Sequence, residues 1–168
     1  MSEEPRIRRR ARLRNKESSD LTAQVAAALG GAKLWPEGAV LESGEFADRA
    51  LLLVDNKLLG LWDGPGPTGP AFLTVRGLLA YRPTARAVTV DMGAVRFVAN
   101  GADIMAPGIV AADPELQPGD WCWIKDEKNG QPLAVGKCIV AGTAMVRGKG
   151  KAVKSIHYLG DKIWTLEP

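Results

Sequence analysis

The densest run of structural signals in the chain is Val90-Asp-Met-Gly-Ala-Val-Arg-Phe-Val-Ala-Asn-Gly-Ala-Asp-Ile-Met-Ala-Pro-Gly108. Residues 93–100 predict a short helix, which Gly101 ends because glycine accepts a positive φ. A strand at 102–105 and a turn at Pro107-Gly108 follow. We expect the apolar side chains of this helix and strand to enter a core rather than to stack on a ligand. These residues are Ala94, Val95, Phe97, Val98, Ile104 and Met105.

Short strands separated by turns surround this run. The hairpin signal is strongest in the predicted turn Asp126-Glu-Lys-Asn-Gly130, because Asn129-Gly130 is a pair that favours hairpin turns. A basic, glycine-bearing segment at 143–154 separates the hairpin from the end of the chain. Many short strands with small helices are typical of a compact barrel. The predicted strands lie at 87–90, 102–105, 121–125, 133–140, 156–158 and 162–166.

The residues upstream predict a helix and a second set of strands. The helix starts after Ser18, Ser19 and Asp20, which are good N-cap residues, and ends at Gly30-Gly31. A hairpin, a glycine- and proline-rich loop and a short helix follow at 51–62, 63–70 and 72–81.

The length of 168 residues suits two small domains, and we place the boundary at Arg82-Pro83-Thr84. The domains are then 1–84 and 85–168. Hydrophobic residues make up 46% of the chain and charged residues 24%, which is ordinary for a globular protein. No apolar run approaches the roughly 18 residues of a membrane span, and no secretory signal opens the chain. We therefore expect a soluble, cytoplasmic protein.

The net charge of +3 conceals two positive clusters. The first is a basic arm at 1–17, either disordered or docked as an extended or helical segment. Phosphates respond to such local clusters rather than to net charge. Its expected contacts are Arg8, Arg9, Arg10, Arg12 and Arg14, and the second cluster contains Arg147, Lys149, Lys151 and Lys154.

Two phosphate-loop patterns fail on physical grounds. Gly64-Pro-Gly-Pro-Thr-Gly69 matches the dinucleotide fingerprint, but its prolines lack N–H donors and no helix is predicted to begin there. Arg147-Gly-Lys-Gly150 is followed by Lys151, so no hydroxyl is placed to hold magnesium. We expect no cofactor.

The remaining reactive residues predict structural roles. Cys122 and Cys138 lie in strand-like stretches outside any zinc-knuckle spacing, so we expect reduced core cysteines and no metal. His157 is the chain's one histidine and sits in an apolar strand, which favours a structural role over a triad. No nucleophile–base pair is evident, so we expect no enzyme.

The run at 90–108 resembles the opening of a PUA domain, an RNA-binding module. The closing segment Ile156-His-Tyr-Leu-Gly-Asp-Lys-Ile-Trp164 sharpens the likeness to the malignant-T-cell-amplified-sequence family and its archaeal counterparts. Upstream, Leu53-Val-Asp-Asn-Lys-Leu-Leu59 and Leu73-Thr-Val-Arg-Gly-Leu-Leu79 resemble the pre-PUA domain of that family. The resemblance therefore spans nearly the whole chain.

The resemblance implies an α+β protein in which an α/β pre-PUA domain precedes a PUA mixed β pseudobarrel with short helices. It also implies action on the small ribosomal subunit, in recycling, reinitiation or initiator tRNA placement. RNA, as small-subunit rRNA or tRNA, is the implied partner, with an initiation-factor-like protein completing the activity. We expect a monomer in isolation. The alternative is an accessory protein that docks tRNA or rRNA for a separate RNA-modification enzyme.

The resemblance implies an RNA surface formed by the first helix of the PUA domain, the following strand and the last strand. Arg96 is the expected phosphate contact on that helix, against a merely solvated arginine. Gly93 either allows close approach of an RNA backbone or satisfies the geometry of the helix start. The expected contacts are Gly93, Ala94, Arg96, Asn100, Gly101, Ala102, Lys149, Lys151 and Lys154.

Overall fold

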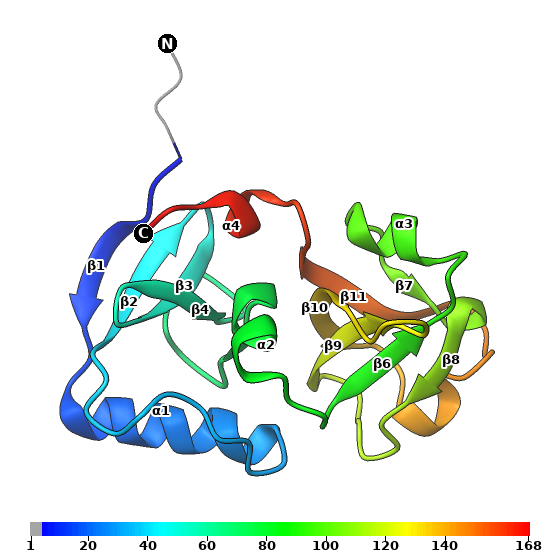
Figure 1. Cartoon of the computed structure of the whole chain (residues 1–168), viewed down its shortest axis with the longest axis horizontal. Helices are drawn as coiled ribbons and strands as arrows, with labels where there is room; N and C mark the ends of the chain where they lie inside the picture. The colour runs from blue at the N-terminus through cyan, green and yellow to red at the C-terminus, as the bar shows by residue number, and fades with distance from the viewer. Residues whose placement is uncertain (1–4) are drawn as a thin grey trace. The chain divides into compact units, whose positions relative to one another are not determined.

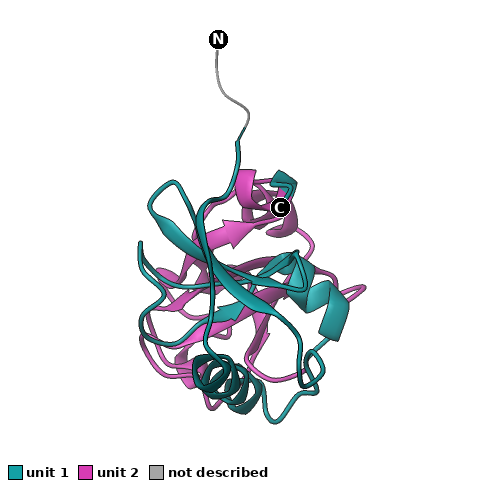
Figure 2. Ribbon diagram, turned by 90° about the vertical axis from the view of Figure 1, so that its left-hand side faces the viewer, with its two compact units in different colours: residues 1–83, 165–168 teal, residues 84–164 magenta. Residues whose placement is uncertain are grey.

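The computed structural model describes residues 5–168 and divides them into two compact units (Figure 2). The first unit contains the chain up to residue 83 together with residues 165–168, and the second contains residues 84–164. Residues 1–4 of the predicted basic arm lie outside the described residues. Each unit is built on its own β-sheet with short helices, which confirms the α+β class. No helix in the described part of the chain combines the length and apolar character needed to cross a membrane.

The first unit contains a five-stranded antiparallel sheet (Figure 1). The predicted hairpin is confirmed, because Val54 pairs with Lys57 around Asp55-Asn56, whose φ angles are 47° and 63°. Each strand pairs with the next in sequence. The strands are β1 (Arg8–Arg12), β2 (Leu41–Phe46), β3 (Arg49–Val54), β4 (Lys57–Leu61) and β5 (Phe72–Leu73).

Two helices complete this unit, α1 (Asn15–Ala28) and α2 (Val75–Tyr81). The predicted start of α1 after residues 18–20 is wrong, because the helix begins at Asn15. Glu17 in its first turn accepts a hydrogen bond from the Arg14 backbone N–H at 3.1 Å. That acceptor satisfies a helix-start donor and places the first turn earlier. The α1 side chain Gln24 both donates to and accepts from the Ala71 backbone, which ties the helix to the segment before β5.

The second unit contains a six-stranded mixed sheet that forms a nearly closed barrel. Its strand order is β7-β11-β10-β9-β6-β8, with β6 and β9 parallel and the other pairs antiparallel. The predicted hairpin at Asn129-Gly130 connects β9 and β10, and the Asp126 carboxylate accepts backbone N–H groups within its turn. The strands are β6 (Ala87–Val90), β7 (Ile104–Met105), β8 (Ile109–Ala112), β9 (Trp121–Asp126), β10 (Pro132–Cys138) and β11 (Lys151–Tyr158).

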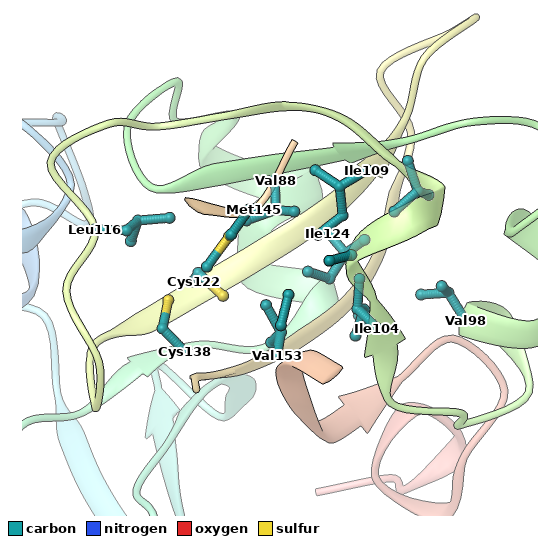
Figure 3. Close-up of a cluster of buried hydrophobic side chains, with 14 of the residues drawn as sticks. Val88, Val98, Ile104, Ile109, Leu116, Cys122, Ile124, Cys138, Met145 and Val153 are labelled. Carbon is teal, nitrogen blue, oxygen red and sulfur yellow. The ribbon is translucent and has the colours of Figure 1, made fainter. Parts of the chain in front are cut away.

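One face of this sheet packs on a hydrophobic core (Figure 3). Cys122 and Cys138 lie in it, buried and free, so their predicted burial is confirmed. Burial of apolar surface contributes about 25 cal/mol per Å², and this core is the main stabilising contact of the unit. The larger side chains labelled around the cysteines include Val88, Ile104, Ile109, Leu116, Ile124, Met145 and Val153.

The end of the second unit differs from prediction. Residues 162–166 do not form a strand; they contain the short helix α4 (Lys162–Thr165). Asp161 explains the difference, because its carboxylate accepts the backbone N–H of Trp164 at 2.8 Å, as a helix-capping residue does. Strand β11 also starts at Lys151, five residues before the predicted strand at 156–158.

The same carboxylate holds the buried histidine. Asp161 Oδ2 lies 2.8 Å from His157 Nδ1 and accepts the Tyr158 backbone N–H at 3.0 Å. Burial alone raises the pKa of Asp161, but the hydrogen bond and charge of His157 and the two N–H donors outweigh it and lower that pKa. His157 therefore serves the fold, as predicted.

We expect Asp161→Asn to lower the free energy of unfolding by about 1–3 kcal/mol near neutral pH. Folding lowers the pKa of Asp161. The stability that the ionised Asp161 gives the folded protein is therefore present above the ordinary aspartate pKa and is lost as pH falls through the lowered value. Urea unfolding as a function of pH tests this, with exposed Asp48→Asn as the control. A stability difference from wild type that persists in strong acid would contradict the assignment.

Candidate nucleic-acid interface

The helix α3 (Val95–Ala99) follows strand β6 after a turn at residues 91–94, which begins with Asp91. The Asp91 backbone N–H donates to the Gly108 carbonyl at 2.9 Å, and its carboxylate accepts the Ala94 N–H at 3.0 Å. These two bonds fix both the start of α3 and its distance from the loop at residues 106–108. The helix start is therefore set by an aspartate rather than by Gly93.

Arg147 clamps this turn from the loop before β11. Its guanidinium donates to Asp91 Oδ2 at 2.7 Å and to the Pro107 carbonyl at 2.6 Å. The hydrogen bond from Arg147 is the largest cause that lowers the pKa of Asp91, with the Ala94 N–H adding to it. Asp91 therefore stays ionised, and Arg147, which the sequence placed in a basic cluster, is partly neutralised.

The outer surface of α3 presents Arg96 and Phe97. Phe97 is 54% exposed, so its predicted place in the core is wrong, whereas Val98 is buried as expected. Helical spacing explains the difference: at about 100° per residue, Ala94, Val95 and Val98 share one face, and Phe97 lies beside it. The Arg96 guanidinium lies 4.8 Å from the centre of the Phe97 ring, so a cation and an aromatic face form one surface.

Strand β7 adds a second exposed apolar side chain. Ile104 is buried, as predicted, but Met105 is 46% exposed, and its predicted burial is wrong. Successive strand residues point to opposite sides, so the burial of Ile104 requires Met105 to face outward. Met92, which the sequence did not single out, is 45% exposed. The exposure of Met105 could have been predicted from the sequence, because a strand residue next to a buried one points to the opposite side.

A hollow of about 440 Å³ lies between α3, β7 and the loop at 106–108. Its lining is mainly apolar, and two aspartates, Asp91 and Asp103, are its charged members. Of the predicted contacts, Gly93, Ala94 and Ala102 line it, whereas Arg96, Asn100 and Gly101 lie on or just after α3 without lining it. The lining residues are Asp91, Gly93, Ala94, Phe97, Val98, Ala102, Asp103, Ile104, Met105, Pro107 and Gly108.

Of the three predicted lysines, Lys151 forms an ion pair with a residue of this hollow, and Lys154 acts on the same residue, Asp103, through its charge alone. Lys151 Nζ lies 3.2 Å from Asp103 Oδ2, while Asp103 Oδ1 accepts the Ser155 N–H at 3.0 Å. The Ser155 hydrogen bond is the largest cause that lowers the pKa of Asp103, and Lys151 adds to it. Lys149 and Lys154 are exposed and have no ion-pair partner among residues 5–168.

The two glycines on either side of α3 have different structural roles. Gly101 has φ +96°, which strains any other residue, and a Cβ there would lie 2.7 Å from carbons of the Tyr158 ring, which would have to shift. A Cβ on Gly93 would meet only Asp91 Oδ1, at an ordinary 3.4 Å. The fold therefore requires Gly101 and does not require Gly93. Asn100 follows α3 and donates from its side chain to the Arg96 carbonyl at 2.7 Å.

The surface formed by α3, β7 and the hollow suits binding through ring stacking, apolar contact and hydrogen bonding. No group of three or more metal-ligating side chains is found among the described residues. The predicted arginines of the basic arm belong to the first unit and do not line this hollow.

The sequence model of the PUA domain matches residues 86–159, which contain α3, β7 and the hollow. A hypothetical protein of Pyrococcus horikoshii has a crystal structure that superposes with a TM-score of 0.82 at 34% identity, covering 94% of this chain and 98% of that one. An uncharacterized protein of Methanocaldococcus jannaschii is 44% identical over 95 residues, 56% of this chain and 59% of that protein.

Two further relatives have informative names. Translation machinery-associated protein 20 of Saccharomyces cerevisiae is 38% identical over 85 residues, 46% of each chain. Malignant T-cell-amplified sequence 1 of Rattus norvegicus is 31% identical over 121 residues, 70% of this chain and 65% of that protein. This chain is a PUA-domain protein related to these two proteins.

The expected PUA fold and family relationship are thus confirmed. The chain spans about half the length of the curated relatives it matches. In the PUA domain of this chain, the surface of α3 and β7 is the candidate RNA interface.

The two glycines of the PUA domain provide a test of which positions serve the fold. We expect Gly101→Ala to lower the free energy of unfolding by about 1–3 kcal/mol, through strained backbone and contact with Tyr158. Gly93→Ala should change it by less than about 0.5 kcal/mol. Urea unfolding measures both. Equal losses for the two variants would show that Gly93 also serves the fold.

Proposed function

We propose that this chain is a non-catalytic RNA-binding protein that acts on the small ribosomal subunit and tRNA. One observation carries the proposal: the PUA domain exposes Phe97 and Met105 at an apolar hollow beside the cation Arg96. Exposed aromatic rings beside cations are typical of surfaces that bind unpaired bases. The name of one relative, translation machinery-associated protein 20, connects that protein with translation and directs the proposal to the ribosome.

The chemistry of the hollow suits a base better than a phosphate. Asp91 and Asp103 stand at its wall as carboxylates paired with Arg147 and Lys151, and these contacts lower the pKa of both groups. Carboxylates repel phosphate but accept hydrogen bonds from the amino groups of bases. In this proposal a base stacks on Phe97, and Gly93 leaves room for the backbone that carries it.

The cations around the hollow would then hold the phosphates. Arg96 is the first candidate, because it is exposed on α3 and lies over the ring that a base would contact. Lys149 and Lys154 add positive charge from the segment before β11 and from β11 itself. Lys151 is held by Asp103 and contributes less.

We further propose that the process is subunit recycling, reinitiation or initiator tRNA placement, completed by an initiation-factor-like protein partner. Action on ribosomal subunits would place the protein in the cytoplasm. The role of accessory protein to an RNA-modification enzyme is the alternative, and the two roles differ in the complex that the protein joins.

Substitutions on α3 test the RNA surface directly. We expect Arg96→Glu to weaken tRNA binding by at least roughly tenfold at low salt, and Phe97→Ala to remove about 1–3 kcal/mol of stacking. Fluorescence anisotropy with labelled tRNA measures both, and urea unfolding should show little change because both side chains are exposed. Lys128→Glu on the exposed β9–β10 turn is the charge-matched control. Unchanged binding by Arg96→Glu would remove α3 from the interface.

Sedimentation through sucrose gradients tests the proposed target. We expect wild-type protein in cell extract to move with small ribosomal subunits and Arg96→Glu to remain at the top of the gradient. Recovery of the wild-type protein with an RNA-modifying enzyme, and none with small subunits, would favour the accessory role.

A further inference from the structure

The first unit carries an arginine-rich strand that the α3 surface does not use. Strand β1 (Arg8–Arg12) is an edge strand, because it pairs only with β2 in the sheet order (Figure 1). All five of its residues are exposed, and four of them are arginines. The predicted basic arm is thus a docked strand from residue 8 onward and a helix from residue 15.

One arginine of the strand is committed to the fold. Arg10 donates to both oxygens of Glu42, at 3.1 and 3.0 Å, and to Asn56 Oδ1 at 2.7 Å. This two-pronged contact fixes the strand on its neighbour, because a guanidinium matches a carboxylate in a rigid geometry. Arg10 is therefore an anchor and has little capacity left for a ligand.

Other arginines of the same segment are available. The Arg9 side chain is 81% exposed, and its ion pair with Glu45 is long, at 3.8 Å. Arg6 and Arg12 are exposed and have no ion-pair partner within residues 5–168. An exposed pair at such a distance contributes little, so Arg9 can exchange Glu45 for another anion.

A bulge in the strand makes it unsuited to pairing with another strand. Arg9 has φ 51°, and the pairing register with β2 shifts between Arg8 and Ala11. Such a bulge interrupts the regular row of N–H and C=O groups that an added strand would need. The segment therefore presents side-chain charge rather than an open β-ladder.

Beside the strand lies a hollow of about 480 Å³. Three arginines line it, and the half-buried ring of Phe46 at the end of β2 adds an aromatic surface. Glu45 is the acidic member of the lining and opposes anions there. The lining residues are Pro5, Arg6, Arg8, Arg9, Glu45, Phe46 and Ala47.

We propose that this arginine strand and its hollow form a second RNA site, which binds the phosphates of an unpaired RNA segment while Phe46 stacks on one of its bases. Grooves that combine cations with an aromatic ring are typical of single-strand binding. Arginine also matches phosphate in a two-pronged geometry that lysine lacks. The site lies on the first unit, outside the matched PUA residues 86–159. The choice of RNA as the anion rests on the proposed function.

The experiment compares the salt dependence of binding to oligouridylate and to a duplex RNA of the same length. The test protein carries Arg6→Gln, Arg9→Gln and Arg12→Gln, and the matched control carries Lys33→Gln, Lys57→Gln and Lys128→Gln at exposed positions. For three lost phosphate contacts, the slope of log K against log salt should become shallower by about 2 for oligouridylate. The control should keep the wild-type slope.

Two further variants guard against loss of folding. Replacing the same arginines with lysine keeps the charge and should keep most of the slope. Glu45→Gln removes the opposing carboxylate and should tighten oligouridylate binding, so the proposal stays testable where the glutamine variant unfolds. Phe46→Leu should weaken oligouridylate binding more than duplex binding.

Two outcomes would overturn the proposal: an unchanged slope in the folded glutamine variant, or equal effects on single-stranded and duplex RNA. Loss of binding to anionic vesicles or to a phosphopeptide, with RNA binding intact, would assign the strand to another partner. Failure of the α3 proposal is separable, because Arg96→Glu tests that surface without altering the arginine strand.

Discussion

The parallel pairing of β6 with β9 is the constraint on which the candidate site depends. Ala87 pairs with Trp123 and Val90 with Asp126, so both strands run in the same direction. Parallel neighbours cannot be joined by a tight turn, and the chain must travel back before β9 can begin. Residues 91–120 make that return, and they carry α3, β7 and β8. The surface proposed to bind RNA is therefore the connection that the sheet topology requires.

Local contacts then give that connection one conformation. The Asp91 carboxylate holds the start of α3, Arg147 ties Asp91 to the Pro107 carbonyl, and Tyr158 packs against Gly101 at the end of the helix. A helix as short as Val95–Ala99 has little stability of its own, because helix formation is cooperative. These contacts and the burial of Val98 hold it in place.

Sequence patterns predicted the elements whose signals are local. Asn129-Gly130 and Asp55-Asn56 identified two hairpins because turn preferences reside in the turn residues themselves. Strand β2 was not predicted, since Ser43 and Gly44 interrupt its apolar alternation and its pairing with β3 and β1 is non-local. Phe97 was predicted to lie in the core because the apolar character of its side chain was given more weight than its position beside the buried face of the helix. The sequence left the arm open as disordered, extended or helical, because the acceptor Glu42 that fixes it lies 32 residues away from Arg10.

The contact between Gly101 and Tyr158 links the evolution of two positions far apart in the chain. Any side chain at 101 needs the space that the tyrosine ring occupies, as well as a backbone angle that glycine accepts most readily. Replacement of Gly101 costs less once residue 158 is smaller, because the reverse order places a Cβ against the tyrosine ring. Among divergent relatives, the two positions should change together and in that order.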